Sequence, residues 1–172
     1  MNMKKIFLTM VLCMLPFQFA LAKSAPVDNW KILATTSSGI YSYDETSLKS
    51  IPANVPPKDI IIMAADASSV ITDKNFLGLL GDTYGKKIKK NDQPNKVYLH
   101  VEMNLTDHTY RITEASVWTE ANKQIEKKKL KTKFAPILAN TFVAALFDKA
   151  QEKVKAWQEP MKTDDKVATD RR

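Results

Sequence analysis

The chain has few of the residues from which disulfides, metal centres and phosphate-binding loops are made. Its 172 residues include one cysteine, two histidines and four glycines. Because Cys13 lies in an N-terminal segment that we expect to be removed, the remaining chain forms neither a disulfide nor a thiolate metal site. Zinc requires three or four suitably spaced ligands, and the run from Gly78 to Gly81 lacks the lysine and the spacing of a phosphate-binding loop. We therefore predict no metal and no cofactor.

The sequence also lacks a recognisable catalytic arrangement. Nucleophilic catalysis needs an activated serine, cysteine or threonine beside a base. The pattern places His100 on the polar face of a strand and His108 in a turn, and we interpret both as solvated imidazoles. No pair of carboxylates stands out from the surface charge in the way that glycoside hydrolysis would need. These absences predict a protein that is not an enzyme.

Residues 1–22 have the pattern of a secretory signal peptide. Lys4 and Lys5 precede an apolar run, and Ala20 and Ala22 are small residues at the two positions that a signal peptidase recognises. We expect cleavage after Ala22 and no transmembrane segment in the mature chain, because the apolar run is short for a membrane span. The short signal indicates a bacterial protein of the periplasm or cell surface. Nucleic acid is not an expected partner of such an exported protein.

The strongest structural signal is a pair of strands within residues 97–119. In residues 97–105 apolar side chains alternate with polar ones, which is the period of a strand with one buried face. Residues 110–119 are rich in β-branched and aromatic side chains, and a short polar linker, residues 106–109, joins the two runs. The pattern predicts an antiparallel β-hairpin whose apolar face needs a cover.

Further strands and connectors are predicted around this hairpin. Gly39 suits a turn position that requires a positive φ. Three prolines make residues 52–58 an extended connector that cannot lie inside a sheet, and residues 75–95 are predicted to form a loop with a small apolar plug. The additional predicted strands are residues 30–35, 40–43, 59–65 and 125–132.

One strong helix is predicted, at residues 140–157, where apolar side chains recur every three or four residues. Asn140 or Thr141 is the expected N-cap. The predicted fold class is α+β, an antiparallel β-sheet of five or six strands with a C-terminal helix packed on one face. We predict a single domain over residues 23–157 and a disordered charged tail over residues 158–172, which has few apolar side chains.

One candidate binding feature is a row of lysines in the strand predicted at residues 125–132. Alternate residues of a strand share a face, and a slip by one residue would expose Leu130 and bury charge. Such a row attracts polyanions, including acidic glycans. The alternative is a solvated edge that blocks aggregation between strands. We call this feature the lysine row; it comprises Lys127, Lys129, Lys131 and Lys133.

The order of several short segments resembles a known family. The run from Trp30 to Leu33 is followed by Ile-Tyr-Ser-Tyr-Asp-Glu-Thr-Ser-Leu at residues 40–48, and then by Tyr-Arg-Ile at residues 110–112 and by Val117 and Trp118. This order, closed by a C-terminal helix, resembles that of surface-adhesin protein E-like domains over about residues 29–157. The resemblance implies a six-stranded antiparallel sheet that carries a helix, and a non-enzymatic surface protein that binds host extracellular-matrix or serum proteins.

In that family a disulfide connects the helix to the sheet. Here Asp107 stands near the first cysteine position and Phe147 near the second, so burial alone would hold the helix. We expect an exported bacterial envelope protein that acts as a binding or adhesion module, for host matrix or serum proteins or for acidic glycans. The alternatives are a periplasmic assembly or inhibitor protein and an envelope hydrolase.

Overall fold

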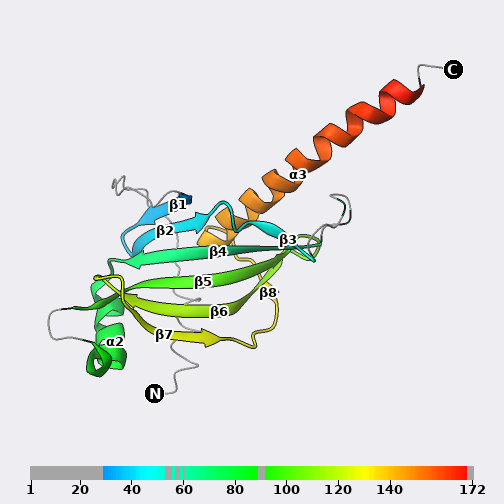
Figure 1. The fold of residues 1–172 in the computed structure, drawn as a ribbon. Helices are drawn as coiled ribbons and strands as arrows, with labels where there is room; N and C mark the ends of the chain where they lie inside the picture. Colours follow the sequence, from blue (N-terminus) through cyan, green and yellow to red (C-terminus); the bar gives the residue numbers. More distant parts are fainter. Residues whose placement is uncertain (1–28, 53–55, 57–58, 60, 89–91, 170–172) are drawn as a thin grey trace.

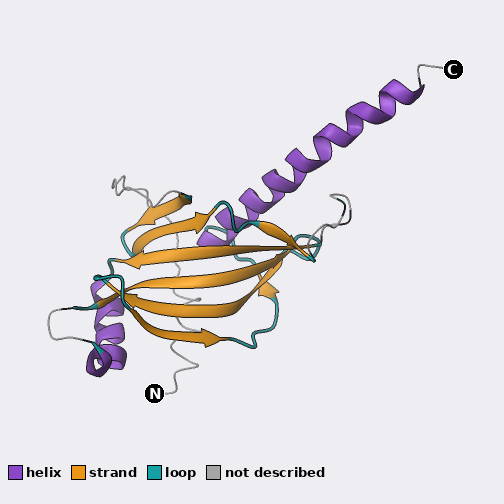
Figure 2. Cartoon of the chain, in the orientation of Figure 1, coloured by secondary structure: helices purple, strands orange, loops and turns teal. Residues whose placement is uncertain are grey.

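The computed structural model describes residues 29–52, 56, 59, 61–88 and 92–169 of the chain. An eight-stranded antiparallel sheet forms its body (Figure 1; Figure 2). Six strands lie in the order β1-β2-β4-β5-β6-β7, and the short strands β3 and β8 pair with β4 and β6. The strands are β1 (Trp30–Thr36), β2 (Gly39–Asp44), β3 (Lys49–Ile51), β4 (Ile62–Ile71), β5 (Pro94–Asn104), β6 (Thr109–Thr119), β7 (Gln124–Lys129) and β8 (Ala135–Pro136).

The α+β prediction is confirmed, and the strands predicted at residues 30–35 and 40–43 correspond to β1 and β2. The signal peptide expected at residues 1–22 and most of the connector expected at residues 52–58 lie outside the described residues.

The predicted hairpin is confirmed as β5 and β6. Val101 and Met103 of β5 are fully buried, as the alternation predicts. The connecting turn contains His108 at a φ of 52°. The side-chain oxygen of Asn104 accepts two backbone N–H groups of this turn, at 2.9 and 3.1 Å, so a local side chain fixes the chain reversal.

The buried face of the sheet is covered by α3 (Phe142–Thr169). The hydroxyl oxygen of Thr141 accepts the backbone N–H of Ala144 at 3.2 Å, which is the contact of an N-cap. Phe142 stacks on Tyr41 with 5.7 Å between ring centroids, and Leu146 is fully buried. The helix stripe predicted from the sequence is therefore the part of α3 that contacts the core.

The C-terminal segment differs from the sequence-based prediction. α3 continues through residues 158–169, where we expected a disordered tail, and it projects beyond the sheet (Figure 1). A helix gains one backbone hydrogen bond for each residue that it adds after nucleation. Polar composition therefore predicts that the segment lies away from the core, but it does not prevent the helix from continuing.

The loop predicted at residues 75–95 is wrong for its first part, which forms α2 (Lys74–Tyr84). The Asp73 side chain accepts the backbone N–H of Phe76 at 2.8 Å and caps the helix. Leu80 and Tyr84, one turn apart, are buried. Glycine lowers helix propensity by only about 1 kcal/mol relative to alanine, and the cap and the buried face outweigh the glycines in this segment.

Both ends of β4 and the turn at Gly39 also differ from the predictions. β4 is Ile62–Ile71 instead of residues 59–65, because the strand continues through small residues that pair with β5. Gly39 does not adopt a positive φ. A Cβ atom at Gly39 would lie 2.4 Å from the carbonyl oxygen of Val70, so glycine is required there by the close approach of β2 to β4.

The contact between the hairpin turn and α3 is aromatic, which agrees with the expectation that burial alone holds the helix. The His108 ring lies 4.9 Å from the Phe147 ring, measured between centroids. Phe147 is 5% exposed. Packing therefore joins α3 to the β5–β6 turn at the place where the resembled family has its disulfide.

Candidate functional site

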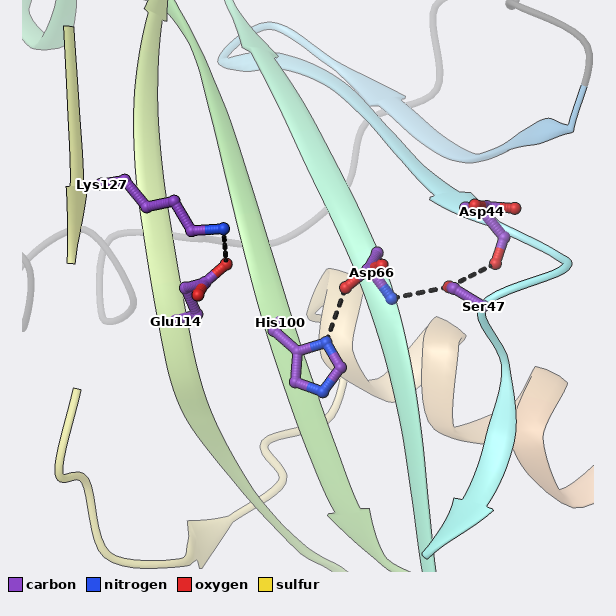
Figure 3. Close-up of polar contacts among 6 residues, drawn as sticks. All are labelled: Asp44, Ser47, Asp66, His100, Glu114 and Lys127. Atoms are coloured by element: carbon purple, nitrogen blue, oxygen red, sulfur yellow. Dashed lines mark hydrogen bonds and ion pairs between the residues drawn. The ribbon is translucent and has the colours of Figure 1, made fainter. Parts of the chain in front are cut away.

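One face of the sheet lies opposite α3 and is free of the helices that the structure describes. Side chains alternate along each strand, so Tyr98, His100 and Glu102 point away from the core that their neighbours form. Strand pairing places Asp66 of β4 on one side of His100 and Glu114 of β6 on the other. Figure 3 shows Asp66, His100 and Glu114 in front of the sheet, with α3 behind it. We call this surface the uncovered face.

An aspartate–histidine pair lies on the uncovered face (Figure 3). His100 Nδ1 is 2.6 Å from Asp66 Oδ1. Since a carboxylate only accepts, Nδ1 donates the proton. This hydrogen bond lowers the pKa of Asp66 and raises the pKa of His100, and the negative charges of Asp66, Glu102 and Glu114 add to the rise. The other ring nitrogen, Nε2, has no hydrogen-bond partner among the residues that the structure describes.

The backbone position of Asp66 is fixed by the turn between β2 and β3. The Ser47 hydroxyl donates to the carbonyl oxygen of Asp44 at 2.7 Å, and its oxygen accepts the N–H of Asp66 at 2.8 Å (Figure 3). The carboxylate therefore projects toward His100 from an ordered segment. The nearby positive charges of Lys49 and Lys127 contribute to the lowered pKa of Asp66.

A shallow hollow of about 410 Å³ lies beside the pair, next to a β-bulge in β6. His100 pairs with Glu114 while Val101 pairs with Ile112, so Thr113 is an extra residue of β6. A bulge redirects side chains and interrupts the regular ladder. The hollow is lined by Asp66, His100, Thr113, Glu114 and Lys129.

Opposite charges balance around the hollow. Lys127 Nζ lies 2.7 Å from Glu114 Oε1 (Figure 3), whereas Lys129 has no ion pair within the part of the chain that the structure describes. Two carboxylates, Asp66 and Glu114, thus face two ammonium groups. The charge state of His100 decides whether the local sum is zero or positive.

Three aromatic side chains cross the same face next to the hollow, and sequence reasoning missed them. Tyr98 contacts Trp30 edge-on at 5.6 Å and Trp118 edge-on at 5.5 Å, measured between ring centroids. All three are half-buried. The alternation in β5 places Tyr98 on the polar face, but only the cross-strand register brings the tryptophans to it. We call these three residues the aromatic row.

Serine side chains on neighbouring strands lie beside the aromatic rings. Ser42 and Ser68 are hydrogen-bonded to each other at 3.1 Å, and the indole N–H of Trp118 donates to the Ser116 hydroxyl at 2.9 Å. Ser68 and Ser116 pair with Tyr98 from its two sides. The surface therefore has the half-buried hydroxyl groups of Ser42 and Ser68 beside its aromatic rings.

The geometric premise of the lysine row is wrong. β7 ends at Lys129, so only Lys127 and Lys129 share a strand face, and Lys131 and Lys133 follow in irregular chain. Past the end of β7 the Leu130 N–H donates to the Thr113 carbonyl oxygen at 2.7 Å, and the Thr132 hydroxyl donates to the Ile112 carbonyl oxygen at 2.6 Å. The side chain of Leu130 packs against the core as expected. The four lysines remain candidates for anion binding, but not as an evenly spaced line.

A second polar cluster lies on the helix side and connects α2 to β7. The Tyr84 hydroxyl donates to Glu126 Oε2 at 2.8 Å, and Lys87 Nζ lies 3.6 Å from Glu126 Oε1. Burial and this hydrogen bond raise the pKa of Tyr84. The cluster satisfies polar groups at the edge of the core, so we assign it a structural role.

The chemistry available to the site is that of hydrogen bonding and aromatic contact. Among the described residues no group of three or more histidine, cysteine, aspartate or glutamate side chains is placed to hold a metal ion. A carboxylate-oriented histidine is the arrangement of a general base, but no described hydroxyl is hydrogen-bonded to His100. No helix in the described ranges has the length and apolar character needed to cross a membrane.

Comparison of the chain with protein-family models, with curated proteins and with solved structures produced no match.

Proposed function

We propose that this chain is an exported bacterial envelope protein that acts as a non-enzymatic binding module and holds its ligand on the uncovered face. The observation that carries the proposal is the aromatic row. Tyrosine and tryptophan are enriched at binding surfaces because they present a large rigid area at a low cost in conformational entropy. Here they lie on the face that the described helices leave open, half-buried against each other.

The surroundings of the aromatic row support binding better than catalysis. The hollow is shallow and open, whereas catalytic sites exclude water and hold the reacting groups in fixed contact. The signal-peptide pattern supports export, and the resemblance to surface-adhesin protein E-like domains supports host extracellular-matrix or serum proteins as ligands. A ligand from the same bacterial envelope would correspond to a periplasmic assembly or inhibitor protein.

A capture experiment tests the proposal. The purified protein is immobilised and exposed separately to serum and matrix proteins, to an envelope fraction and to a glycan library. Trp118→Ala removes a large ring from the uncovered face. Leu138→Ala is the matched control, because Leu138 is 60% exposed and precedes α3. We expect the Trp118 variant to lose at least tenfold in affinity for the captured ligand. Equal capture by both variants would contradict the use of this face.

An envelope hydrolase is the second candidate, and the Asp66–His100 pair is the observation that favours it. A histidine held at 2.6 Å by a carboxylate is positioned to accept a proton through Nε2. Turnover of a glycan or peptide substrate that His100→Ala abolishes, in a variant that remains folded, would establish this function in place of the binding module.

A further inference from the structure

The aromatic row and its serines fit a ligand that is apolar on its faces and hydroxylated at its edges. Aromatic rings carry negative charge on their faces and attract polarised C–H groups. Pyranose rings have such C–H groups on their flat sides and hydroxyl groups around their rims. The rings of Trp30 and Trp118 stand at 71° and 69° to that of Tyr98, so the row offers differently oriented faces and edges to successive units of a chain.

The hollow continues this surface along β5. Tyr98 and His100 are alternate residues of one strand, so their side chains leave the sheet about 6.8 Å apart. This separation allows one sugar ring to contact Tyr98 while the next reaches the hollow. There the carboxylates of Asp66 and Glu114 accept hydrogen bonds from sugar hydroxyls, and Lys129 and Thr113 donate to them.

The charge balance of the hollow distinguishes an uncharged ligand from a polyanion. The carboxylates of Asp66 and Glu114 offset the ammonium groups of Lys127 and Lys129, and Lys127 is already paired with Glu114 at 2.7 Å. The two negative side chains would repel a sulfate or carboxylate group of a ligand in the hollow. The hydroxyl groups of a neutral sugar would instead donate hydrogen bonds to them. This arrangement disfavours an acidic glycan relative to a neutral one.

Resting on the binding function proposed above, we infer that the uncovered face binds an uncharged oligosaccharide chain, with pyranose rings on the aromatic row and hydroxyl groups in the hollow. The ligand lies across β4, β5 and β6, because two of the three aromatic residues and every residue of the hollow except Lys129 of β7 come from these three strands. Hydrogen bonding and ring contact supply the affinity, and net charge contributes little.

Tryptophan fluorescence provides the test. The chain has three tryptophans, and Trp157→Phe leaves only the two that belong to the aromatic row. This variant is titrated with hexasaccharides of N-acetylglucosamine and of glucose, and separately with heparin. We expect a saturable change with at least one neutral hexasaccharide and the same affinity at low and high salt, because a neutral ligand is not screened.

Further substitutions in the Trp157→Phe protein separate the contribution of ring contact from that of charge. Trp118→Ala should weaken binding of the neutral hexasaccharide about tenfold, with Trp30 as the remaining reporter. Lys129→Gln removes a charge from the hollow but retains a hydrogen-bond donor, so it should weaken binding less than Trp118→Ala does, by roughly threefold. Leu138→Ala should leave the affinity unchanged, and thermal unfolding verifies that each variant is folded.

Two results would overturn the inference: binding of heparin with no response to either neutral hexasaccharide, and neutral-sugar binding that Trp118→Ala leaves intact in a folded protein. Capture of a protein ligand through Trp118, without any oligosaccharide response, would refute the glycan inference and leave the binding function standing. Turnover abolished by His100→Ala would refute the binding function itself, so the two failures are distinguishable.

Discussion

Replacement of Leu146 by alanine tests whether burial alone holds α3 on the sheet. Leu146 is 0% exposed and lies one turn after Phe142 within the core. Removal of a fully buried leucine side chain costs about 2–5 kcal/mol, the lost transfer free energy plus the energy of the cavity. We expect destabilisation of about 3 kcal/mol and a Tm lowered by roughly 10 °C.

Leu138→Ala is the matched control, because it removes the same atoms from a side chain that is 60% exposed. Surface substitutions of this kind change stability by about 0.5 kcal/mol or less. Thermal and urea unfolding of both variants, followed by circular dichroism, measures the difference. Leu146→Asp should prevent folding, because it buries an unpaired charge. Equal Tm values for the two alanine variants would refute the packing of α3 described here.

Two further predictions concern charge. The raised pKa of His100 adds stability that is present below pH about 6.5 and is lost as pH rises through the raised value. The lowered pKa of Asp66 adds stability that is present above pH about 4 and is lost as pH falls through the lowered value. A double-mutant cycle with His100→Gln and Asp66→Asn should therefore show coupling of about 1 kcal/mol or less, largest between these pH values, and constant coupling up to pH 9 would contradict it. The second prediction compares a variant with glutamine at all four positions of the lysine row with a control that has glutamine at four exposed lysines elsewhere. The salt concentration at which the protein elutes from heparin should fall by the same amount in both variants. A clearly larger fall in the lysine-row variant would restore the row as a specific anion site. The four control positions are Lys74, Lys86, Lys123 and Lys155.

The elements that could be predicted from the sequence are those whose signal is local. The alternation around Val101 and the helical spacing around Leu146 each lie within one element, and both residues are buried as expected. The missed helix α2 shows that local signals can conflict, because its glycines favour a loop whereas the Asp73 cap and the spacing of Leu80 and Tyr84 favour a helix. Propensity is a weak prior that tertiary contacts override.

The candidate site depended on contacts that no local pattern contains. Asp66 and His100 are 34 positions apart, and Trp30 reaches Tyr98 across two intervening strands. These pairs exist only because β4 and β5 adopt one particular register. A shift of one residue would move Asp66 to the helix side of the sheet, so the position of every side chain on the uncovered face is a property of the whole sheet.

The lysine row fails because β7 ends at Lys129, so that Lys131 and Lys133 follow in irregular chain. Just past this end the Leu130 N–H still donates to the carbonyl oxygen of Thr113 at 2.7 Å. Thr113 is the extra residue of β6 in its pairing with β5. Thr113 and Lys129 line the hollow together with His100. The ligand-accessible chemistry of this face is therefore a mixture of donors and acceptors, where the sequence alone predicted a line of positive charge.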